Sequence, residues 1–175
     1  MAGILDNAIR RWLQDPHKIL GPYIKEGMTV LDLGCGPGFF SVEIALMAGK
    51  SGQVIAADLQ EEMLQKLRDK IKGTELEKRI TLLRSEENKI GLAENVDFVL
   101  AFYMVHETLD QEKLLHEIIS RLKPDGHILI VEPLFHVSKT AFQETVKKAV
   151  DSGLVPVESP KVFLSRAVLM KKSRQ

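Results

Sequence analysis

The fold is decided by one stretch of sequence, Val30-Leu31-Asp32-Leu33-Gly34-Cys35-Gly36-Pro37-Gly38-Phe39-Phe40. Apolar residues and one carboxylate lead into three alternating glycines, and apolar residues at helical spacing follow. This order predicts a buried strand, a tight turn and a helix. Glycine permits a positive φ and a close approach of a ligand to the backbone, and the start of a helix offers free N–H groups. We therefore expect the turn to hold a small polar ligand.

Strands and helices alternate along the rest of the chain. Apolar runs predict short strands at residues 28–33, 54–58, 80–83, 96–102 and 127–131. Apolar residues at helical spacing and capping signals predict helices over residues 2–13, 16–20, 39–48, 60–72, 114–122 and 142–150. Strands that look buried on both faces and alternate with helices are typical of a parallel α/β sheet. The last two β-like runs, 154–162 and 165–171, predict an antiparallel hairpin.

Capping residues support the ends of two of these helices. Asp15 followed by Pro16 has the pattern of an N-cap and a proline at the first helical position, and Ser138 is a candidate N-cap for the last helix. The segment 73–78 is expected to be only a polar loop.

The composition limits the class of protein. The 175 residues, of which 45% are hydrophobic, suit one domain with a full core. The 24 basic and 24 acidic residues cancel, which argues against nucleic acid or an anionic membrane as a partner. A single cysteine, Cys35, excludes internal disulfides and a multi-thiolate metal site. Because no apolar run approaches the roughly 18 residues of a membrane span and no secretory signal is seen, a cytoplasmic protein is expected.

The spacing of the glycines narrows the ligand. A dinucleotide-binding turn has glycine at the first, third and sixth positions, whereas the sixth position counted from Gly34 is Phe39. No G-K-[ST] follows, which excludes a P-loop for nucleoside triphosphates. Asp32, two residues before the first glycine, would repel a pyrophosphate and attract a cationic amine. The turn therefore favours a cationic ligand without phosphate groups.

The sequence V-L-D-L-G-C-G-P-G resembles motif I of the class I S-adenosylmethionine-dependent methyltransferases, a seven-stranded Rossmann-like family. Asp58, which follows Gly38 by 20 residues, is similar to the family's acid at the end of the second strand. Residues 96–100 resemble its fourth strand, and residues 123–130 resemble its K-P-G-G turn and fifth strand, with Asp125 in place of the first glycine.

The resemblance covers about residues 15–172 and implies the fold. It implies an α/β three-layer sandwich with helices on both faces of a seven-stranded, mostly parallel sheet of order 3-2-1-4-5-7-6, in which the last strand is antiparallel. We expect a single methyltransferase domain over residues 1–175, with a Rossmann-like core at 25–172. The N-terminal helical region, 1–24, would either pack on the core or cover a pocket as a lid.

The resemblance also implies that the cofactor is S-adenosylmethionine, with S-adenosylhomocysteine as the product. Asp58 would accept hydrogen bonds from both ribose hydroxyls, as the acid of dinucleotide-binding folds does. Asp32 and Gly34 would lie near the methionine end, where a carboxylate beside an ammonium group is favourable.

The adenine end is less closely matched to the family. Ser85 or Glu86 would bind the adenine amino group, Leu59 would offer the ring an apolar face, and Cys35 would fill the turn beneath the cofactor. The cofactor-binding residues predicted in this way are Asp32, Gly34, Cys35, Gly36, Gly38, Asp58, Leu59, Ser85, Glu86 and Ala101.

Candidate catalytic residues follow the fourth and fifth strands, because open α/β sheets bind ligands at the carboxyl ends of their strands. Methyl transfer is an in-line displacement that needs positioning, and it needs a base only where the acceptor loses a proton. We expect His106 to be that base, or to shape the substrate site or the helix start. Tyr103 would line the acceptor pocket or pack in the core, and Glu132 would orient the substrate. No metal is predicted, because these residues lack a recognisable metal spacing.

The acceptor is narrowed by what the sequence lacks. The motif [DNS]-P-P-[YF], which is the signature of amino methyltransferases that act on nucleobases, does not follow the fourth strand. Almost no residues lie outside the expected core fold, so we expect no separate domain for recognition of a macromolecule. A small-molecule acceptor is therefore the leading hypothesis. A protein or RNA methyltransferase that needs a partner subunit, a nicotinamide-dependent oxidoreductase and a non-catalytic cofactor-binding module are the alternatives.

Overall fold

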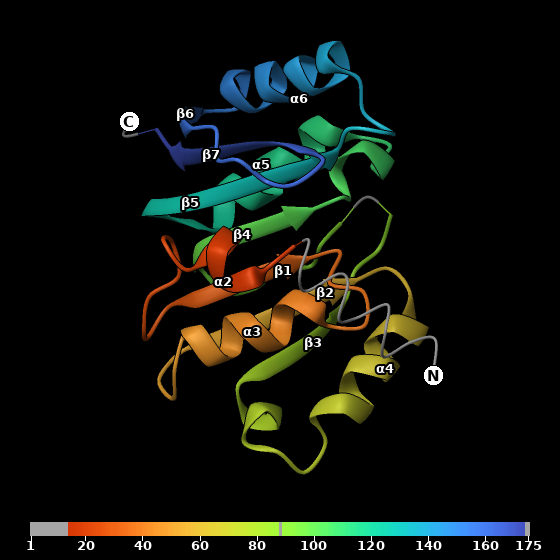
Figure 1. Cartoon of the computed structure of the whole chain (residues 1–175), viewed down its shortest axis with the longest axis vertical. Coiled ribbons are helices and arrows are strands. Elements are labelled where there is room, and N and C mark those ends of the chain that lie inside the picture. Colours follow the sequence, from red (N-terminus) through yellow and green to blue (C-terminus); the bar gives the residue numbers. More distant parts are fainter. Residues whose placement is uncertain (1–13, 88, 174–175) are drawn as a thin grey trace.

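A computed structural model describes residues 14–87 and 89–173 (Figure 1). The helix expected over residues 2–13, and with it the lid hypothesis, lies outside the described residues. Among the described residues, no helix is long and apolar enough to cross a membrane.

A seven-stranded sheet runs through the middle of the molecule, in the order β3-β2-β1-β4-β5-β7-β6 (Figure 1). Neighbouring strands pair in parallel except that β7 is antiparallel to both β5 and β6. The strands are β1 (Thr29–Leu33), β2 (Gln53–Asp58), β3 (Ile80–Arg84), β4 (Val96–Phe102), β5 (Leu122–Pro133), β6 (Leu154–Glu158) and β7 (Ser165–Lys172). The predicted order and the predicted antiparallel strand are both confirmed.

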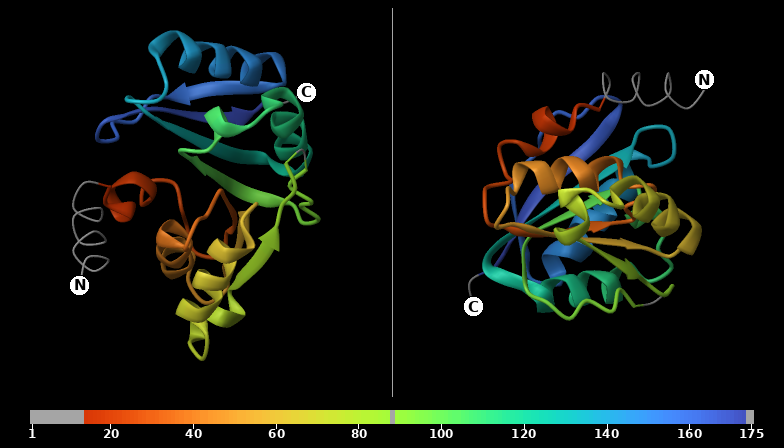
Figure 2. Two further views of the ribbon diagram at one scale, coloured as in Figure 1. Left: turned by 90° about the vertical axis from the view of Figure 1, so that its right-hand side faces the viewer. Right: turned by 90° about the horizontal axis from the view of Figure 1, so that it is seen from below.

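Helices cover both faces of the sheet, as Figure 2 shows, with α3 and α4 on one side and α5 on the other. The helices are α2 (Pro16–Leu20), α3 (Phe39–Met47), α4 (Glu61–Ile71), α5 (Gln111–Arg121) and α6 (Lys139–Asp151). Two short 3-10 helices, η1 (Glu75–Lys78) and η2 (Val105–Glu107), complete the described elements. The three-layer arrangement follows from strands that are apolar on both faces, because each face needs a helical cover.

Each face of the sheet contributes one apolar cluster to the core. Val30 packs with α3 and α4 on one face, whereas its neighbour Leu31 packs with α5 on the other. Successive side chains of a strand point to opposite faces, so the continuous apolar run of β1 fills both clusters. The same alternation in β4 explains why nearly all of that strand is buried.

The predicted caps are confirmed. The Asp15 carboxylate accepts a hydrogen bond from the His17 N–H at 3.0 Å, with Pro16 at the first position of α2. The Ser138 hydroxyl accepts from the Ala141 N–H at 3.1 Å at the start of α6. These side chains satisfy N–H groups that have no partner within the helix.

Three segments differ from the prediction. β5 begins at Leu122, so the expected turn at 123–126 lies within the strand, where Lys123 Nζ donates to Asp97 Oδ2 at 2.8 Å. The expected polar loop at 73–78 contains η1, which Thr74 caps by accepting from the Leu76 N–H. β6 stops at Glu158 rather than near residue 162, because the chain must turn before β7.

The glycine turn provides a test of the fold. Gly38 has φ +79°, and a Cβ there would lie 2.2 Å from Cδ1 of Leu67, which is fully buried. Gly36 has φ +53°, but a Cβ there would meet nothing within 4 Å. Gly38→Ala therefore adds a steric clash to the cost of a left-handed alanine, and we expect a loss of about 2–5 kcal/mol in the free energy of unfolding. Gly36→Ala should cost about 1–2 kcal/mol, from backbone strain alone.

Urea unfolding of the two variants measures this difference. Equal losses of stability would contradict the packing of the turn against α4.

Candidate functional site

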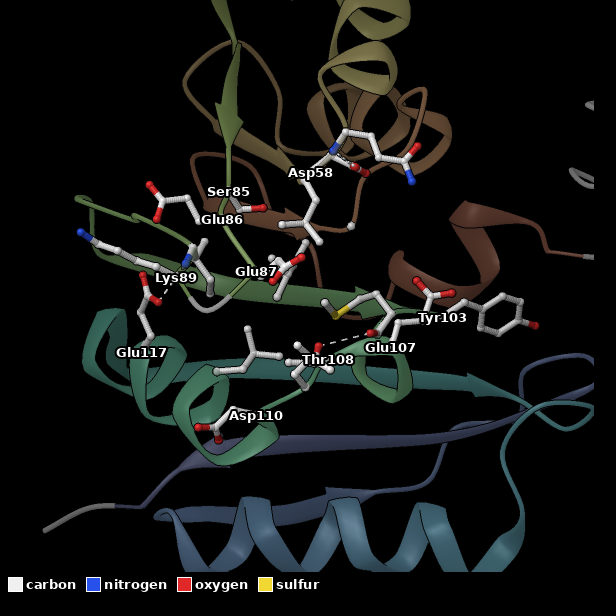
Figure 3. Close-up of a pocket in the computed structure, with 18 residues that line it drawn as sticks. Asp58, Ser85, Glu86, Glu87, Lys89, Tyr103, Glu107, Thr108, Asp110 and Glu117 are labelled. Atoms are coloured by element: carbon white, nitrogen blue, oxygen red, sulfur yellow. Dashed lines mark hydrogen bonds between the residues drawn. The ribbon is translucent and has the colours of Figure 1, made fainter.

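A cleft of about 410 Å³ opens at the carboxyl ends of β1, β2 and β4 (Figure 3). Its walls come from the glycine turn, the end of β2, the segment after β3 and the segment between β4 and α5. The lining residues are Leu33, Gly34, Asp58, Leu59, Gln60, Ser85, Glu86, Glu87, Lys89, Ile90, Tyr103, Met104, Glu107, Thr108, Leu109, Asp110, Leu114 and Glu117.

The glycine turn is held against the end of β2. The Ala57 carbonyl accepts from the N–H groups of Gly34 and Cys35 at 2.9 and 3.0 Å. Gly34 has φ +71°, and a Cβ there would lie 2.9 Å from Cβ of Met104. The turn therefore needs glycine at position 34 both for its conformation and for its contact with the segment after β4.

Asp58 joins this turn to the cleft. Its Oδ2 accepts from the Gly36 N–H at 2.8 Å, and its Oδ1 accepts from the Gln60 N–H at 2.9 Å. The carboxylate is thereby fixed in orientation while it still lines the cleft (Figure 3). A carboxylate has about four acceptor positions, so the two bonds leave capacity for hydroxyl donors from a ligand.

The residues predicted to bind the cofactor fall into two groups. Those that line the cleft are Gly34, Asp58, Leu59, Ser85 and Glu86. Those that lie outside its lining are Asp32, Cys35, Gly36, Gly38 and Ala101. In this second group Cys35, Gly36 and Gly38 belong to the turn, whereas Asp32 lies in β1 and Ala101 in β4.

Asp32 and Cys35 lie beneath the cleft. Asp32 is buried, and its Oδ2 accepts from the Ser41 hydroxyl at 2.5 Å. Burial, together with the negative charges of Asp32 and Asp58, raises the pKa of the Cys35 thiol far above its usual range. Cys35 is therefore a neutral thiol that fills the turn, and it has no nucleophilic role at ordinary pH.

The charges that line the cleft fit a cationic ligand. Among the described residues that line it, six are acidic and one, Lys89, is basic. The acids are Asp58, Glu86, Glu87, Glu107, Asp110 and Glu117. A sulfonium and an ammonium group suit such a lining, whereas a pyrophosphate would be repelled. The acidic lining of the cleft therefore fits S-adenosylmethionine.

Several residues of the cleft were missed by the sequence reasoning. Glu107, Thr108 and Asp110 follow β4, and Glu117 lies on α5. The Glu117 carboxylate accepts from the N–H groups of Ile90 and of the following glycine at 2.9 and 2.8 Å, which closes this side of the cleft. These residues lie just before α5 or on its polar side, and the apolar periodicity that predicted this helix carries no signal for its polar side chains.

His106 and Glu132 form a pair beside the cleft. His106 Nδ1 lies 2.5 Å from Glu132 Oε2, and the His106 N–H donates to Glu132 Oε1 at 3.1 Å. Only 1% of Glu132 is exposed, and this burial raises the pKa of its carboxyl, an effect that the nearby His106 opposes in part. His106 Nε2 lies 3.9 Å from Glu107 Oε1, and Glu107 lines the cleft. The contact of Nδ1 with Glu132 thus leaves Nε2 beside Glu107, a residue of the cleft wall.

Tyr103 lines the cleft at the end of β4, but its ring points away from it (Figure 3). The phenol oxygen lies 2.5 Å from Ser165 Oγ and accepts from Gln14 Nε2 at 2.9 Å. Its backbone has φ +60°, which is strained for a bulky residue. The hydroxyl is therefore committed to bonds that join β4, β7 and the segment before α2.

Within the described residues, no group of three or more His, Cys, Asp or Glu side chains could hold a metal ion.

Comparison with known proteins gives the family. The model of a methyltransferase domain matches residues 24–157. A crystal structure of an S-adenosylmethionine-dependent methyltransferase from Aquifex aeolicus is 32% identical, with a TM-score of 0.84, and the match covers 96% of this chain and 95% of that one.

Curated relatives match over a shorter part of their length. The ubiquinone/menaquinone biosynthesis C-methyltransferase of Haemophilus ducreyi is 31% identical over 116 residues, which is 64% of this chain and 45% of that protein. The demethylmenaquinone methyltransferase of Lactobacillus johnsonii is 34% identical over 110 residues, which is 62% of this chain and 45% of that protein. The chain thus matches somewhat less than half the length of these relatives.

The nicotinamide-dependent alternative is set aside by the matches to methyltransferases. The family model, the sheet order and the Aquifex structure agree. The chain belongs to the class I S-adenosylmethionine-dependent methyltransferases.

Proposed function

We propose that this methyltransferase acts on a small-molecule acceptor that binds beside the cofactor cleft, and that His106 takes the acceptor's proton. The observation that carries the proposal is the His106–Glu132 pair at the carboxyl ends of β4 and β5. One curated relative is a C-methyltransferase of ubiquinone and menaquinone biosynthesis and the other is a demethylmenaquinone methyltransferase, which supports a small-molecule acceptor.

The pair suits a general base. With Glu132 ionised, Nδ1–H of a neutral His106 donates to its carboxylate, which leaves the lone pair of Nε2 to accept a proton. Glu132 would then stabilise the imidazolium that forms. S-adenosylmethionine supplies a methyl group that is electrophilic because it is bound to a sulfonium sulfur. The residues of this chain orient the acceptor, exclude water and hold the proton at Nε2.

The cofactor fits the cleft in one orientation under this proposal. Asp58 would accept from the ribose hydroxyls, Leu59 would pack on the adenine ring, and Ser85 or Glu86 would bind the adenine amino group. Gly34 would lie against the methionine end, above the buried Asp32. The exposed apolar surface of Leu59 and the fixed carboxylate of Asp58 support this arrangement.

The proposal is tested with methyl-labelled cofactor. The purified chain is incubated with a panel of phenols, quinols and amines, and separately with cell-extract protein and RNA. Label in a small organic product supports the proposal. Label only in protein or RNA, or only after a second chain is added, would establish the partner-dependent alternative instead.

The role of Asp58 can be tested by a substitution that removes its charge. Asp58→Asn should weaken the binding of S-adenosylmethionine at least about tenfold, because an amide loses charge-assisted bonds to the ribose and to the turn. Isothermal titration calorimetry measures the dissociation constant. Asp69→Asn, on the exposed side of α4, makes the same chemical change away from the cleft and should leave affinity unchanged. Equal affinities for all three proteins would refute the placement of the ribose.

The role of His106 as a base can be tested by a substitution that removes its imidazole ring. His106→Gln should lower the single-turnover rate by about a hundredfold or more, with unchanged affinity for S-adenosylmethionine, because a general base contributes to the chemical step alone. His116→Gln on α5 is the matched control. A rate that stays unchanged would show that His106 is not the base.

The raised pKa of the Glu132 carboxyl makes the stability of the fold depend on pH. Between the usual pKa of a carboxyl group and this raised value, the unfolded chain loses a proton that the folded chain keeps. The free energy of unfolding should therefore fall as the pH rises through that window. Glu132→Gln should lack this fall, whereas Glu144→Gln, an exposed residue of α6, should retain it. Urea unfolding at a series of pH values measures both, and parallel curves for the wild type and Glu132→Gln would contradict the assignment.

A further inference from the structure

Four large apolar side chains are exposed together on two neighbouring loops. Leu134 and Phe135 lie between β5 and α6, with 40% and 76% of their surface exposed. Phe163 and Leu164 lie between β6 and β7, with 51% and 44% exposed. These four residues are called the loop patch below. They lie outside the cofactor cleft described above.

The loop patch is held in place by the backbone. The Leu134 N–H donates to the Leu164 carbonyl at 3.1 Å, and Arg166 Nη1 donates to the Val137 carbonyl at 2.8 Å. Val137 and Val162 are buried and anchor the two loops from inside. A preformed surface of this kind loses little conformational entropy when a partner covers it.

Leu164 lies in a tight turn at the end of the second loop, which the Ser165 N–H closes by donating to the Val162 carbonyl at 3.2 Å. Leu164 has φ +49°, and it shares a positive φ with Tyr103 alone among the described residues other than glycine. A leucine in this region is strained, yet its side chain is exposed and gains little from the fold. Strain of this kind is common at functional sites.

Within the two loops and the residues that directly follow them, the charged side chains (Lys, Arg, Asp or Glu) are all basic. Residues 134–140 and 159–165 contain Lys139 and Lys161 but no Asp or Glu. Both lysines are exposed, and neither forms an ion pair with any residue of the described chain. Glu158, just before the second loop, accepts a hydrogen bond from the Tyr23 hydroxyl at 2.5 Å. The loop patch is thus apolar, with one lysine near each of its two loops and Glu158 at the end of β6.

We propose that the loop patch docks on the surface of an anionic lipid bilayer. Both loops project from the same end of the sheet, as the left view of Figure 2 shows, so apolar side chains can enter the interface while lysines meet lipid phosphates. A second copy of the chain fits this charge pattern less well, because a two-fold contact of the patch with itself would bring unpaired lysines together. The zero net charge of the chain averages over the surface and does not describe this local region.

Docking in this way would bring one end of the active site close to the bilayer. Glu132, the partner of His106, precedes Leu134 by two residues at the end of β5. An acceptor dissolved in the lipid would then reach the cleft without crossing bulk water. The binding itself does not depend on the acceptor, so a sedimentation test is independent of the function proposed above.

The test is co-sedimentation of the full chain with vesicles of phosphatidylcholine that contain about a quarter phosphatidylglycerol, compared with phosphatidylcholine alone. We expect the wild type to bind the anionic vesicles more strongly, with an affinity that falls as salt is added. Phe135→Ser with Phe163→Ser should lower the partition coefficient at least about tenfold, because two aromatic side chains no longer leave water. Lys139→Glu with Lys161→Glu should abolish the preference for anionic vesicles.

The matched control is Leu46→Ser with Val150→Ser, which removes two exposed apolar residues from α3 and α6. It should bind like the wild type. The proposal is overturned if the wild type stays in the supernatant with both kinds of vesicle, or if the control and the phenylalanine variant bind alike. It is also overturned if light scattering shows a dimer that the phenylalanine variant dissociates, because the occupant of the loop patch would then be a second copy.

Discussion

The backbone N–H groups of the glycine turn need acceptors, and the end of β2 supplies them. The Ala57 carbonyl takes two of these groups and the Asp58 carboxylate takes a third. A buried N–H without a partner costs about 1–3 kcal/mol, so the turn keeps its shape only when β2 is paired with β1 in the observed register, Leu33 opposite Ala57. The same pairing fixes Asp58 at the rim of the cleft. Strand register, turn geometry and the position of the Asp58 carboxylate are therefore one structural unit.

Much of the fold could be predicted, because short apolar strands between amphipathic helices leave few arrangements that bury both faces of a sheet. The prediction was wrong where long-range contacts outweighed local signals. Residues 123–126 contain proline and glycine and were expected to turn, yet β5 already begins at Leu122, where it pairs with Val96. Lys123 and Asp97 form an ion pair across that junction. No local pattern carries such a pairing between residues 26 positions apart.

The candidate site also has a part that the sequence predicted and a part that only the structure shows. The residues of the turn and Asp58 are close in sequence to strong motifs, and the structure brings Gly34, Asp58, Leu59, Ser85 and Glu86 to one cleft. The far wall, from Glu107 to Glu117, combines the segment between β4 and α5 with the first turns of α5, and only the fold shows that it faces β2. His106 and Glu132 were each candidates by residue type. Their contact at 2.5 Å depends on the parallel pairing of β4 with β5, which places the ends of both strands side by side.

The two ends of the proposed reaction path differ in charge, and this difference is consistent with the chemistry. The cleft carries six carboxylic acids and one lysine, which suits a cofactor that is positive at its sulfonium and ammonium groups. Loss of the methyl group removes the sulfonium charge, so a cofactor bound in this cleft would lose part of its attraction to these acids after the transfer. The loop patch has the opposite character, because it consists of exposed apolar side chains. Two lysines lie close to it in the sequence, and its two loops contain no carboxylate. An apolar acceptor would therefore approach over the loop patch and the cationic methyl donor through the acidic cleft. Each surface disfavours the other molecule, and the two would meet where His106 can take the proton.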